Sequence, residues 1–240
     1  KSLKFALAQF FPGYTENTAD WPAGGLHTWK NGVAHISAFL EDYAYLIAAL
    51  LDVWQITFNA DYLDAAKILT SYTIENFFDP SDNLFYFTAS HQSDIILRKK
   101  ELYDNATPSS NSTMARNLQR LSVMLDQEVW ASKAAAMVDV MSPSVVKFPN
   151  GFGRWAEAMS NQDIPVREIA VTGPDSVNLA LELQKQYLPN AVIAADNGIA
   201  SVLPLLAGKE SETETLIYIC RNFACQRPVE SVQEAMTLLH

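Results

Sequence analysis

The 240-residue sequence predicts a mainly α-helical chain in which helical hairpins are followed by a small α/β unit. Apolar residues recur at three- and four-residue steps in paired segments between residues 38 and 141, and the pairs repeat at a spacing of roughly 70 residues. After residue 163, segments rich in β-forming residues alternate with helical ones. We therefore place the hairpins in residues 1–162 and the α/β unit in residues 163–240.

The first 36 residues combine a helix with an irregular segment. Residues 1–11 resemble the end of a helix, and helix-like sequence at the first residue, without an initiating Met, indicates a fragment. Phe11 to Ile36 is predicted to be a long loop because it holds two prolines and four glycines. Trp21 and Trp29 lie within it, and a loop of this length in a compact domain is usually functional.

The strongest helical pattern runs from Ala38 into a second helix. One face of the first helix carries Phe39, Tyr43, Leu46, Leu50 and Trp54. After an interruption at residues 59–61, one face of the second helix carries Tyr62, Ala65, Leu69 and Tyr72. Residues 79–82 then predict a turn, and residues 84–87 predict a short strand.

Two more helices are predicted after Pro108. They are separated by only a few residues around Asp126, so we expect an antiparallel hairpin. Their apolar faces carry Met114, Leu118, Leu121 and Leu125, and then Trp130, Ala134, Met137 and Met141. Ser142-Pro143 is predicted to end the second helix, because proline lacks an N–H donor. A weaker helix is predicted over residues 152–159.

The last 78 residues predict a βαβ unit. A strand at 166–172, a helix at 177–187 and a strand at 191–195 indicate a right-handed parallel pair. A third strand is predicted at 215–220 and a closing helix at 229–239. The turn Gly173-Pro174-Asp175-Ser176 lacks a glycine-rich nucleotide motif. We therefore expect no dinucleotide and no other cofactor.

Composition excludes several classes of protein. The net charge is −10, from 17 basic and 27 acidic residues, so the chain lacks the basic surface that nucleic-acid binding needs. The sequence has no run of eighteen apolar residues, so we expect no membrane span. Two cysteines suit a reducing compartment, and we expect a cytoplasmic protein.

The cysteines and histidines do not indicate a metal site. Cys220 and Cys225 are interpreted as two reduced thiols, with a disulfide or an incomplete metal site as the alternatives. The histidines lack paired-ligand spacing, so we expect no metal. His27 and His35 flank the predicted loop, where one could act as an acid or base; the alternative is that both are ordinary loop residues.

Several motifs occur together in the order of a known family. They are Trp29-Lys30-Asn31-Gly32, Phe39-Leu40-Glu41-Asp42-Tyr43-Ala44, Arg98-Lys99-Lys100-Glu101, the segment 103–112, and Tyr218-Ile219-Cys220 with Cys225 and Pro228. From about Trp29 onward, the chain resembles the spermatogenesis-associated proteins that couple a thioredoxin-like domain to a six-hairpin, glycosidase-like toroid. It departs from them at Asn105 and Ser110, where the family usually has glycine.

The resemblance implies that this chain is the C-terminal part of such a protein. Its helical hairpins would form an incomplete (α/α)6-type toroid, and a thioredoxin-like domain would lie upstream as a partner within the parent protein. In such a toroid, the ends of the inner helices face a central cleft, which the resemblance predicts to be a site for a small carbohydrate.

Four carboxylates are the candidate catalytic groups. Glu41 and Asp42 lie in the first turn of the strongest helix, and Glu101 and Asp104 lie in a polar loop before the helix that starts near Ser109. Paired carboxylates perform acid–base chemistry on glycosides. Adjacent residues point about 100° apart around a helix, so we expect at most one of Glu41 and Asp42 to face a given spot. If one of the two is functional, we prefer Asp42. The alternatives are helix-dipole stabilisation by the first pair and capping by Asp104.

The candidate substrate-binding residues come from the aromatic and polar groups of the same motifs. They are Trp29, Tyr43, Tyr86, Arg98, Ser109 and Asn111. The rings of Trp29, Tyr43 and Tyr86 could stack on sugar rings, and so could those of Trp21 and Tyr103. The alternative is that these aromatic side chains anchor the core or the loops. Ser109 or Asn111 could instead cap the following helix.

Two functions follow from these observations. The first is an enzyme that hydrolyses carbohydrate, or epimerises or isomerises a reducing sugar. The second is a non-catalytic scaffold that binds a partner for the thioredoxin-like domain. An enzyme should bring two carboxylates together at a pocket, whereas a scaffold should use its carboxylates as caps and ion pairs.

Overall fold

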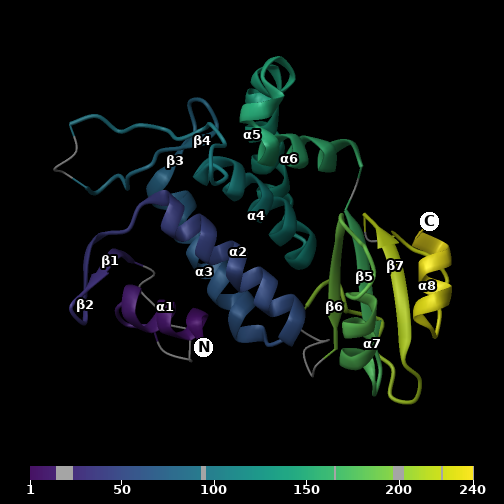
Figure 1. Ribbon diagram of the computed structural model, residues 1–240. Helices are drawn as coiled ribbons and strands as arrows, with labels where there is room; N and C mark the ends of the chain where they lie inside the picture. Colours follow the sequence, from purple (N-terminus) through teal and green to yellow (C-terminus); the bar gives the residue numbers. More distant parts are fainter. Residues whose placement is uncertain (15–23, 93–95, 165, 197–202, 223, 240) are drawn as a thin grey trace.

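A computed structural model describes residues 1–14, 24–92, 96–164, 166–196, 203–222 and 224–239 (Figure 1). Its helical hairpins are followed by a small sheet with its own helices, so the predicted mainly α fold class with a C-terminal α/β unit is confirmed. The change from helices to sheet falls between Asp163 and Arg167. The division of the chain into two domains stays a prediction.

Two helical hairpins form the body of the chain. Its helices are α1 (Ser2–Phe10), α2 (Leu40–Thr57), α3 (Ala60–Phe77), α4 (Ser110–Leu125), α5 (Glu128–Lys147) and α6 (Gly153–Asp163). The α2–α3 and α4–α5 hairpins each turn on a residue in the left-handed conformation, Phe58 and Asp126, both with φ of 50°. Asn59 then caps α3 by accepting a hydrogen bond from the Asp61 N–H.

The hairpins bury the apolar faces that the periodicity predicts. On α2, the buried side chains include Tyr43, Leu46, Leu50 and Trp54, which share one predicted face. They join residues of α3, α4, α5 and α6 in one core cluster. Burial of this stripe, more than helix propensity, stabilises helices of this length.

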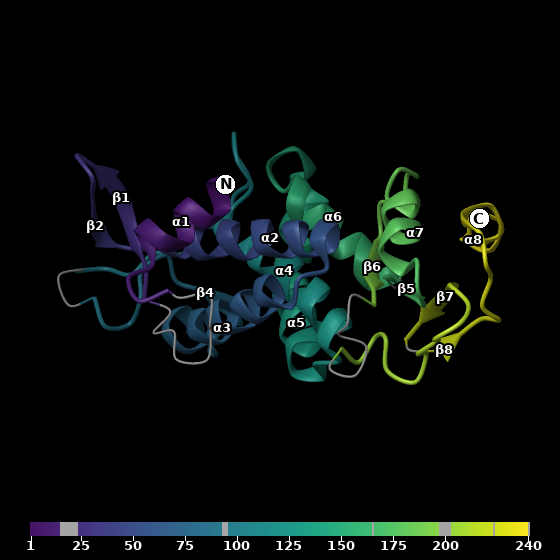
Figure 2. The same cartoon turned by 90° about the horizontal axis from the view of Figure 1, so that it is seen from below.

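The α/β unit is built on a sheet of strand order β6-β5-β7-β8. Its elements are β5 (Arg167–Thr172), α7 (Ser176–Leu183), β6 (Ala191–Ala195), β7 (Leu216–Arg221), β8 (Ala224–Cys225) and α8 (Val232–Leu239). β5 and β6 are parallel and joined through α7, as the sequence predicts, while β7 runs antiparallel to β5. Figure 2 shows that β6 is the strand nearest the hairpins and that α8 lies farthest from them.

Both faces of β5 are buried. Ile169 and Val171 of β5 pack in a cluster with α7 and α8, whereas Ala170, between them, joins the helical core. This alternation follows from the two-residue period of a strand. Phe58 belongs to the sheet cluster, so the turn between α2 and α3 packs into the α/β unit.

The prediction of one long loop from Phe11 to Ile36 is wrong for its second half. β1 (Leu26–Lys30) and β2 (Val33–Ser37) form an antiparallel hairpin. Its turn is Asn31-Gly32, with φ of 52° and 82°. Asn-Gly is a strong signal for a two-residue hairpin turn, because both positions need positive φ. Trp21 lies outside the described residues.

Helix α5 does not end at Ser142-Pro143 but continues to Lys147. Met137 and Met141 before the proline and Val145 after it are all buried on the same helix. Packing on both sides therefore outweighs the hydrogen bond that Pro143 cannot donate. A 3-10 turn, η2 (Pro149–Gly151), then leads into α6.

The interpretation of the cysteines as two reduced thiols is also wrong. Cys220 of β7 and Cys225 of β8 are directly opposed in the antiparallel ladder and form a disulfide. Opposed positions bring Cβ atoms close enough for such a bond. The short strands β3 (Phe78–Asp79) and β4 (Leu84–Phe85) pair in the region where the sequence predicts a turn and a strand.

Within the described parts of the chain, we find no helix that combines the length and the apolar composition of a transmembrane span.

Candidate functional site

A histidine–carboxylate pair lies where β1 meets the start of α2. The Nδ1 atom of His27 is 2.9 and 3.0 Å from the two carboxylate oxygens of Asp42. A carboxylate only accepts, so Nδ1 carries the proton and Nε2 is left as the basic nitrogen of the neutral ring. Asp42 also accepts from the Phe39 N–H at 2.8 Å, which closes the first turn of α2. The backbone of α2 thus fixes the carboxylate that orients the imidazole.

The His27–Asp42 pair lines a small cavity between α1, β1 and α2. Its volume is about 160 Å³, and its other walls are the apolar side chains of Ala6, Phe10, Phe11, Leu26 and Leu46. The ring of His27 also contacts Phe39, with 4.9 Å between the ring centroids. The imidazole of His27 is therefore held by Asp42 on one side and borders a cavity with apolar walls on the other.

Glu41 is the carboxyl beside this pair that holds a proton more strongly than usual. Its pKa is raised, first by burial and then by the negative charges of Asp42 and Glu101, against a smaller opposing effect of His27. A carboxylic acid with a raised pKa keeps its proton to a higher pH than an ordinary one does, which favours a role as a proton donor. Glu41 could thus donate a proton, and Nε2 of the neutral His27 ring could accept one.

Glu101 brings the start of α4 to the same region. Its Oε2 accepts from the Ser110 hydroxyl at 3.1 Å and from the Ser110 N–H at 3.4 Å. These two bonds fix Glu101 at the N-terminus of α4, where the helix dipole favours a negative charge. Its charge in turn is one of the causes of the raised pKa of Glu41.

Asp104 has a different environment from the other three candidate carboxylates. It is 8% exposed, and it accepts hydrogen bonds from the Ser109 N–H, the Ser112 hydroxyl, and the N–H groups of Arg154 and Trp155, at 2.7, 2.6, 2.8 and 3.3 Å. Both of its oxygens are used. Asp104 therefore joins the N-termini of α4 and α6, the capping role that is the alternative to catalysis.

The polar residues proposed to bind substrate are also held by the chain itself. Ser109 is the N-cap of α4 and accepts from the Ser112 N–H. Asn111 is fully buried and bonds to the backbone of Phe85 and to the carbonyl of Glu101. Arg98 donates to the backbone carbonyls of Asn76, in α3, and of Thr88. These contacts fix the loop before α4.

The three aromatic candidates pack against other side chains. Tyr43 is 2% exposed, and its hydroxyl accepts from the Gly25 N–H; burial raises the pKa of this hydroxyl well above its ordinary range. Tyr86 lies under Arg98, whose Cζ is 3.9 Å from the ring centroid. Trp29 lies on β1, with its ring centroid 5.6 Å from that of Phe5 in α1. Trp29 is half-buried and also contacts Phe10 of α1, with 6.2 Å between the ring centroids.

His27 is the functional candidate that the sequence left undecided. It is 15 residues from Asp42, and no fixed spacing connects a strand residue to the first turn of the following helix. The Asn-Gly turn was the signal that could have found it, because a hairpin there places residues 26–30 beside α2. His35 pairs with Thr28 across the same hairpin, on the strand that carries exposed residues.

Comparisons with known proteins agree with the motifs. No protein-family model matches the chain. It is similar over 100% of its length to spermatogenesis-associated protein 20 of Rattus norvegicus, at 28% identity and covering 32% of that protein. The Homo sapiens protein of the same name is 28% identical over 84% of this chain and 27% of its own length. A Caenorhabditis elegans protein, uncharacterised, is 26% identical over 88% of this chain and 30% of its own length.

The chain spans about a third of the length of these curated relatives, at 32% of the Rattus norvegicus protein. The match lies in their C-terminal part, so the predicted resemblance is confirmed. Among solved structures, a GH76 alpha-mannanase of Bacteroides thetaiotaomicron is similar with a TM-score of 0.38 and 19% identity, over 50% of this chain and 31% of that chain.

Proposed function

We propose that this chain contributes an acid–base site that binds and processes a carbohydrate, by hydrolysis or by epimerisation or isomerisation of a reducing sugar. The observation that carries the proposal is the His27–Asp42 pair, which lines a cavity between α1, β1 and α2. Glu41, the neighbour of Asp42 on α2, adds a carboxyl with a raised pKa. Sugar chemistry of either kind needs one group that donates a proton and another that accepts one.

Each residue has a distinct role in the proposed site. Glu41 donates the proton, His27 accepts one through Nε2, and Asp42 holds the imidazole in the required tautomer. Glu101 is a positioning residue, because its charge contributes to the raised pKa of Glu41. The cavity beside His27 has room only for a small group, so the rest of a sugar would lie towards Glu101 and the start of α4. Asp104 is left out of the proposed site, since both of its oxygens are bonded within the chain.

The proposal also covers the complete parent protein. In it, further hairpins would close the (α/α)6-type toroid around this site, and the upstream thioredoxin-like domain would be a partner in the same chain. A cytoplasmic location is part of the same proposal. The Cys220–Cys225 disulfide counts against it, because disulfides are typical of oxidising compartments.

A second function is favoured by the way the carboxylates are used. Asp42 and Asp104 both accept backbone N–H groups at the starts of helices, as expected for a non-catalytic scaffold that binds a protein partner. The two functions predict different properties for Glu41. A scaffold has no need of a carboxyl whose ionisation is disfavoured, whereas an enzyme uses one as an acid.

A thermal-shift screen of the chain with common mono- and disaccharides tests the proposal. A bound sugar stabilises the folded state by mass action, so the melting temperature should rise with sugar concentration. The rise should be smaller or absent in Glu41→Gln, which keeps the size of the side chain and removes its titratable proton.

Glu75→Gln is the matched control, because Glu75 is exposed on α3 and the change is chemically the same. A sugar-specific rise kept in Glu75→Gln and lost in Glu41→Gln supports the carbohydrate site. No rise with any sugar, in a chain that melts cooperatively, contradicts it and favours the scaffold.

A further inference from the structure

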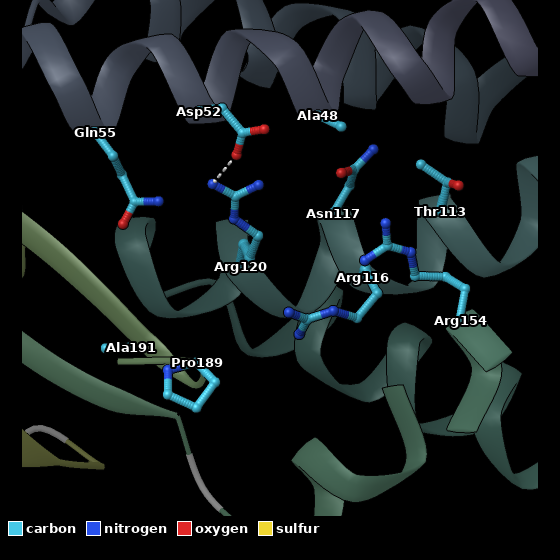
Figure 3. Close-up of a pocket in the computed structure, with 10 residues that line it drawn as sticks. All are labelled: Ala48, Asp52, Gln55, Thr113, Arg116, Asn117, Arg120, Arg154, Pro189 and Ala191. Atoms are coloured by element: carbon cyan, nitrogen blue, oxygen red, sulfur yellow. Dashed lines mark ion pairs between the residues drawn. The ribbon is translucent and has the colours of Figure 1, made fainter. Parts of the chain in front are cut away.

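A second cavity lies between the helical hairpins and the α/β unit (Figure 3). Its volume is about 270 Å³. Side chains of α2, α4 and α6 form one side, and Pro189 and Ala191, at the start of β6, form the other. It is separate from the acid–base site. Glu41 and Asp52 are eleven positions apart on α2, which is about 16 Å along the helix axis.

Three arginines converge on this cavity in a chain whose net charge is −10. Arg116 and Arg120 are four residues apart on α4, so they share one face of that helix. Arg154 comes from the first turn of α6, where the bond from its backbone N–H to Asp104 fixes the start of the helix. Figure 3 shows the three side chains reaching from two helices into the space between α2 and β6.

The chain neutralises these arginines incompletely. Glu157 is shared, at 2.9 Å from Arg116 Nη2 and 2.6 Å from Arg154 Nη1. Arg120 is paired with Asp52 at 2.8 Å, but the side chain of Asp52 is 67% exposed while that of Arg120 is 16% exposed. An exposed partner contributes little to such a pair. Among the described residues, two carboxylates thus pair with three guanidinium groups.

Arg116 is the most buried of the three arginines. Burial lowers its pKa, and the neighbouring charges of Arg120 and Arg154 act in the same direction against Glu157. Its Nη1 donates to the Gln119 side chain at 3.2 Å, but its buried Nε finds no acceptor among the described residues. A buried donor without an acceptor costs free energy. An anion in the cavity would offset the charge that the chain leaves uncompensated.

We propose that this cavity binds a phosphate group, either free or carried by a small organic molecule. Guanidinium groups offer paired N–H donors that match the oxygens of phosphate. A doubly charged tetrahedral anion can accept from donors that approach from different helices, as Arg120 and Arg154 do. Ala48, Pro189 and Ala191 form an uncharged wall that leaves room for a small organic part.

The position of the cavity gives the proposed site a second property. Its arginines belong to the hairpins, while Pro189 and Ala191 belong to the α/β unit. A ligand there would contact both parts and stabilise their packing. Binding should therefore raise the melting temperature of the whole chain.

Isothermal titration calorimetry with inorganic phosphate and with glycerol 3-phosphate tests the proposal. The titrations are made at constant ionic strength against chloride, because general screening also changes with salt. Saturable binding is expected for at least one of the two. Equal affinities identify free phosphate as the ligand, and tighter binding of the ester identifies a phosphate monoester.

Arg154→Gln is the main variant, since Arg154 is the most exposed of the three arginines and Arg116 keeps Glu157 as its partner. It should weaken binding about tenfold or more, the loss typical of a charge-assisted hydrogen bond. Arg120→Gln should have a similar effect. Lys67→Gln, an exposed position on α3 with the same change in charge, should bind as the unaltered chain does.

Amide chemical shifts provide a measurement that does not depend on a variant. Addition of inorganic phosphate should move the NMR signals of residues 113–120 and of the start of α6. The proposal is overturned if neither phosphate compound shows saturable binding at millimolar concentration, or if the shifts lie elsewhere in the chain. It is also overturned if Lys67→Gln weakens binding as much as Arg154→Gln does.

Discussion

At the scale of single residues, neighbours decide what a carboxylate can do. Asp104 and Glu41 were both predicted to be catalytic from the same kind of evidence. Asp104 accepts four hydrogen bonds and is neutralised by two helix N-termini, so its charge stabilises the fold. Glu41 instead lies beside Asp42 and Glu101, whose charges oppose its ionisation. Ionisable groups whose pKa is shifted by their neighbours, as that of Glu41 is, are typical of functional sites.

The raised pKa of Glu41 predicts a pH-dependent stability. A raised pKa means that the folded chain binds this proton more tightly than the unfolded chain does. The contribution of this proton to the free energy of unfolding is therefore fully present below the ordinary pKa of 4.5. It is lost as the pH rises through the raised pKa of the folded chain. Glu41→Gln should be the more stable form at neutral pH, by less than about 1 kcal/mol because the site is partly exposed to solvent.

Urea denaturation across a range of pH measures this difference. The gain from Glu41→Gln should disappear in acid, where the carboxyl of the unaltered chain is protonated in both states. Glu75→Gln should show no such trend. A gain of the same size at every pH would mean that ionisation of Glu41 does not limit the stability.

At the scale of helices and strands, local patterns predict an element well and its ends less well. The apolar stripes of α2, α3, α4 and α5 were visible in the sequence, because burial of one face imposes a 3.6-residue period. The predicted end of α5 at Ser142-Pro143 is wrong, since Pro143 is a local stop signal that packing overrides. The β1–β2 hairpin was missed although its Asn-Gly turn is a strong local signal, because glycines and prolines nearby favoured a loop.

Replacement of Pro143 tests how packing overrides proline in α5. Pro143→Ala restores one N–H donor in a helix that continues to Lys147. A proline inside a helix costs about 3 kcal/mol. Because this position is exposed and lies in the last turns of the helix, we expect a gain of about 1 kcal/mol in the free energy of unfolding.

Urea denaturation also measures this effect, with Pro80→Ala as the control. Pro80 is exposed in the turn before β4, where no helical hydrogen bond is restored. The control should be neutral or slightly destabilising, since proline restricts the unfolded chain. A loss of stability in Pro143→Ala would show that this proline also favours the fold through the unfolded state.

At the scale of the whole molecule, the hairpins and the α/β unit are packed together through the end of α2. Phe58 is fully buried in the cluster of the sheet and its helices. Gln55 accepts from the Ile193 N–H of β6 at 3.0 Å, and its carbonyl accepts from the Gln184 side chain. These contacts hold β6 beside α2 and so form the cavity that the three arginines line.

Phe58→Ala tests this packing. Removing a buried phenyl group leaves a cavity and typically costs 3–5 kcal/mol, so we expect a loss of about 3 kcal/mol or more in the free energy of unfolding. Phe148→Ala is the matched control, because Phe148 is 56% exposed after α5, and its loss should be within about 0.5 kcal/mol. Similar losses in the two variants would contradict the role of Phe58 as the contact between the two parts.

The sequence by itself determined the main helices, their pairing and the parallel βαβ unit. These features rest on periods of two and 3.6 residues and on short connections, so the information for each lies within a few turns of chain. The family motifs were also local. They were therefore visible in order along the chain before any contact was known.

Only the tertiary structure decided what the charged residues do. His27 meets Asp42 across 15 residues, the Arg154 N–H meets Asp104 across 50, and Gln55 meets Ile193 across 138. No repeat in the sequence encodes such distances, since they depend on how whole elements pack. Both proposed sites arise in this way, because a pKa or an uncompensated charge is set by groups that come together only when the chain has folded.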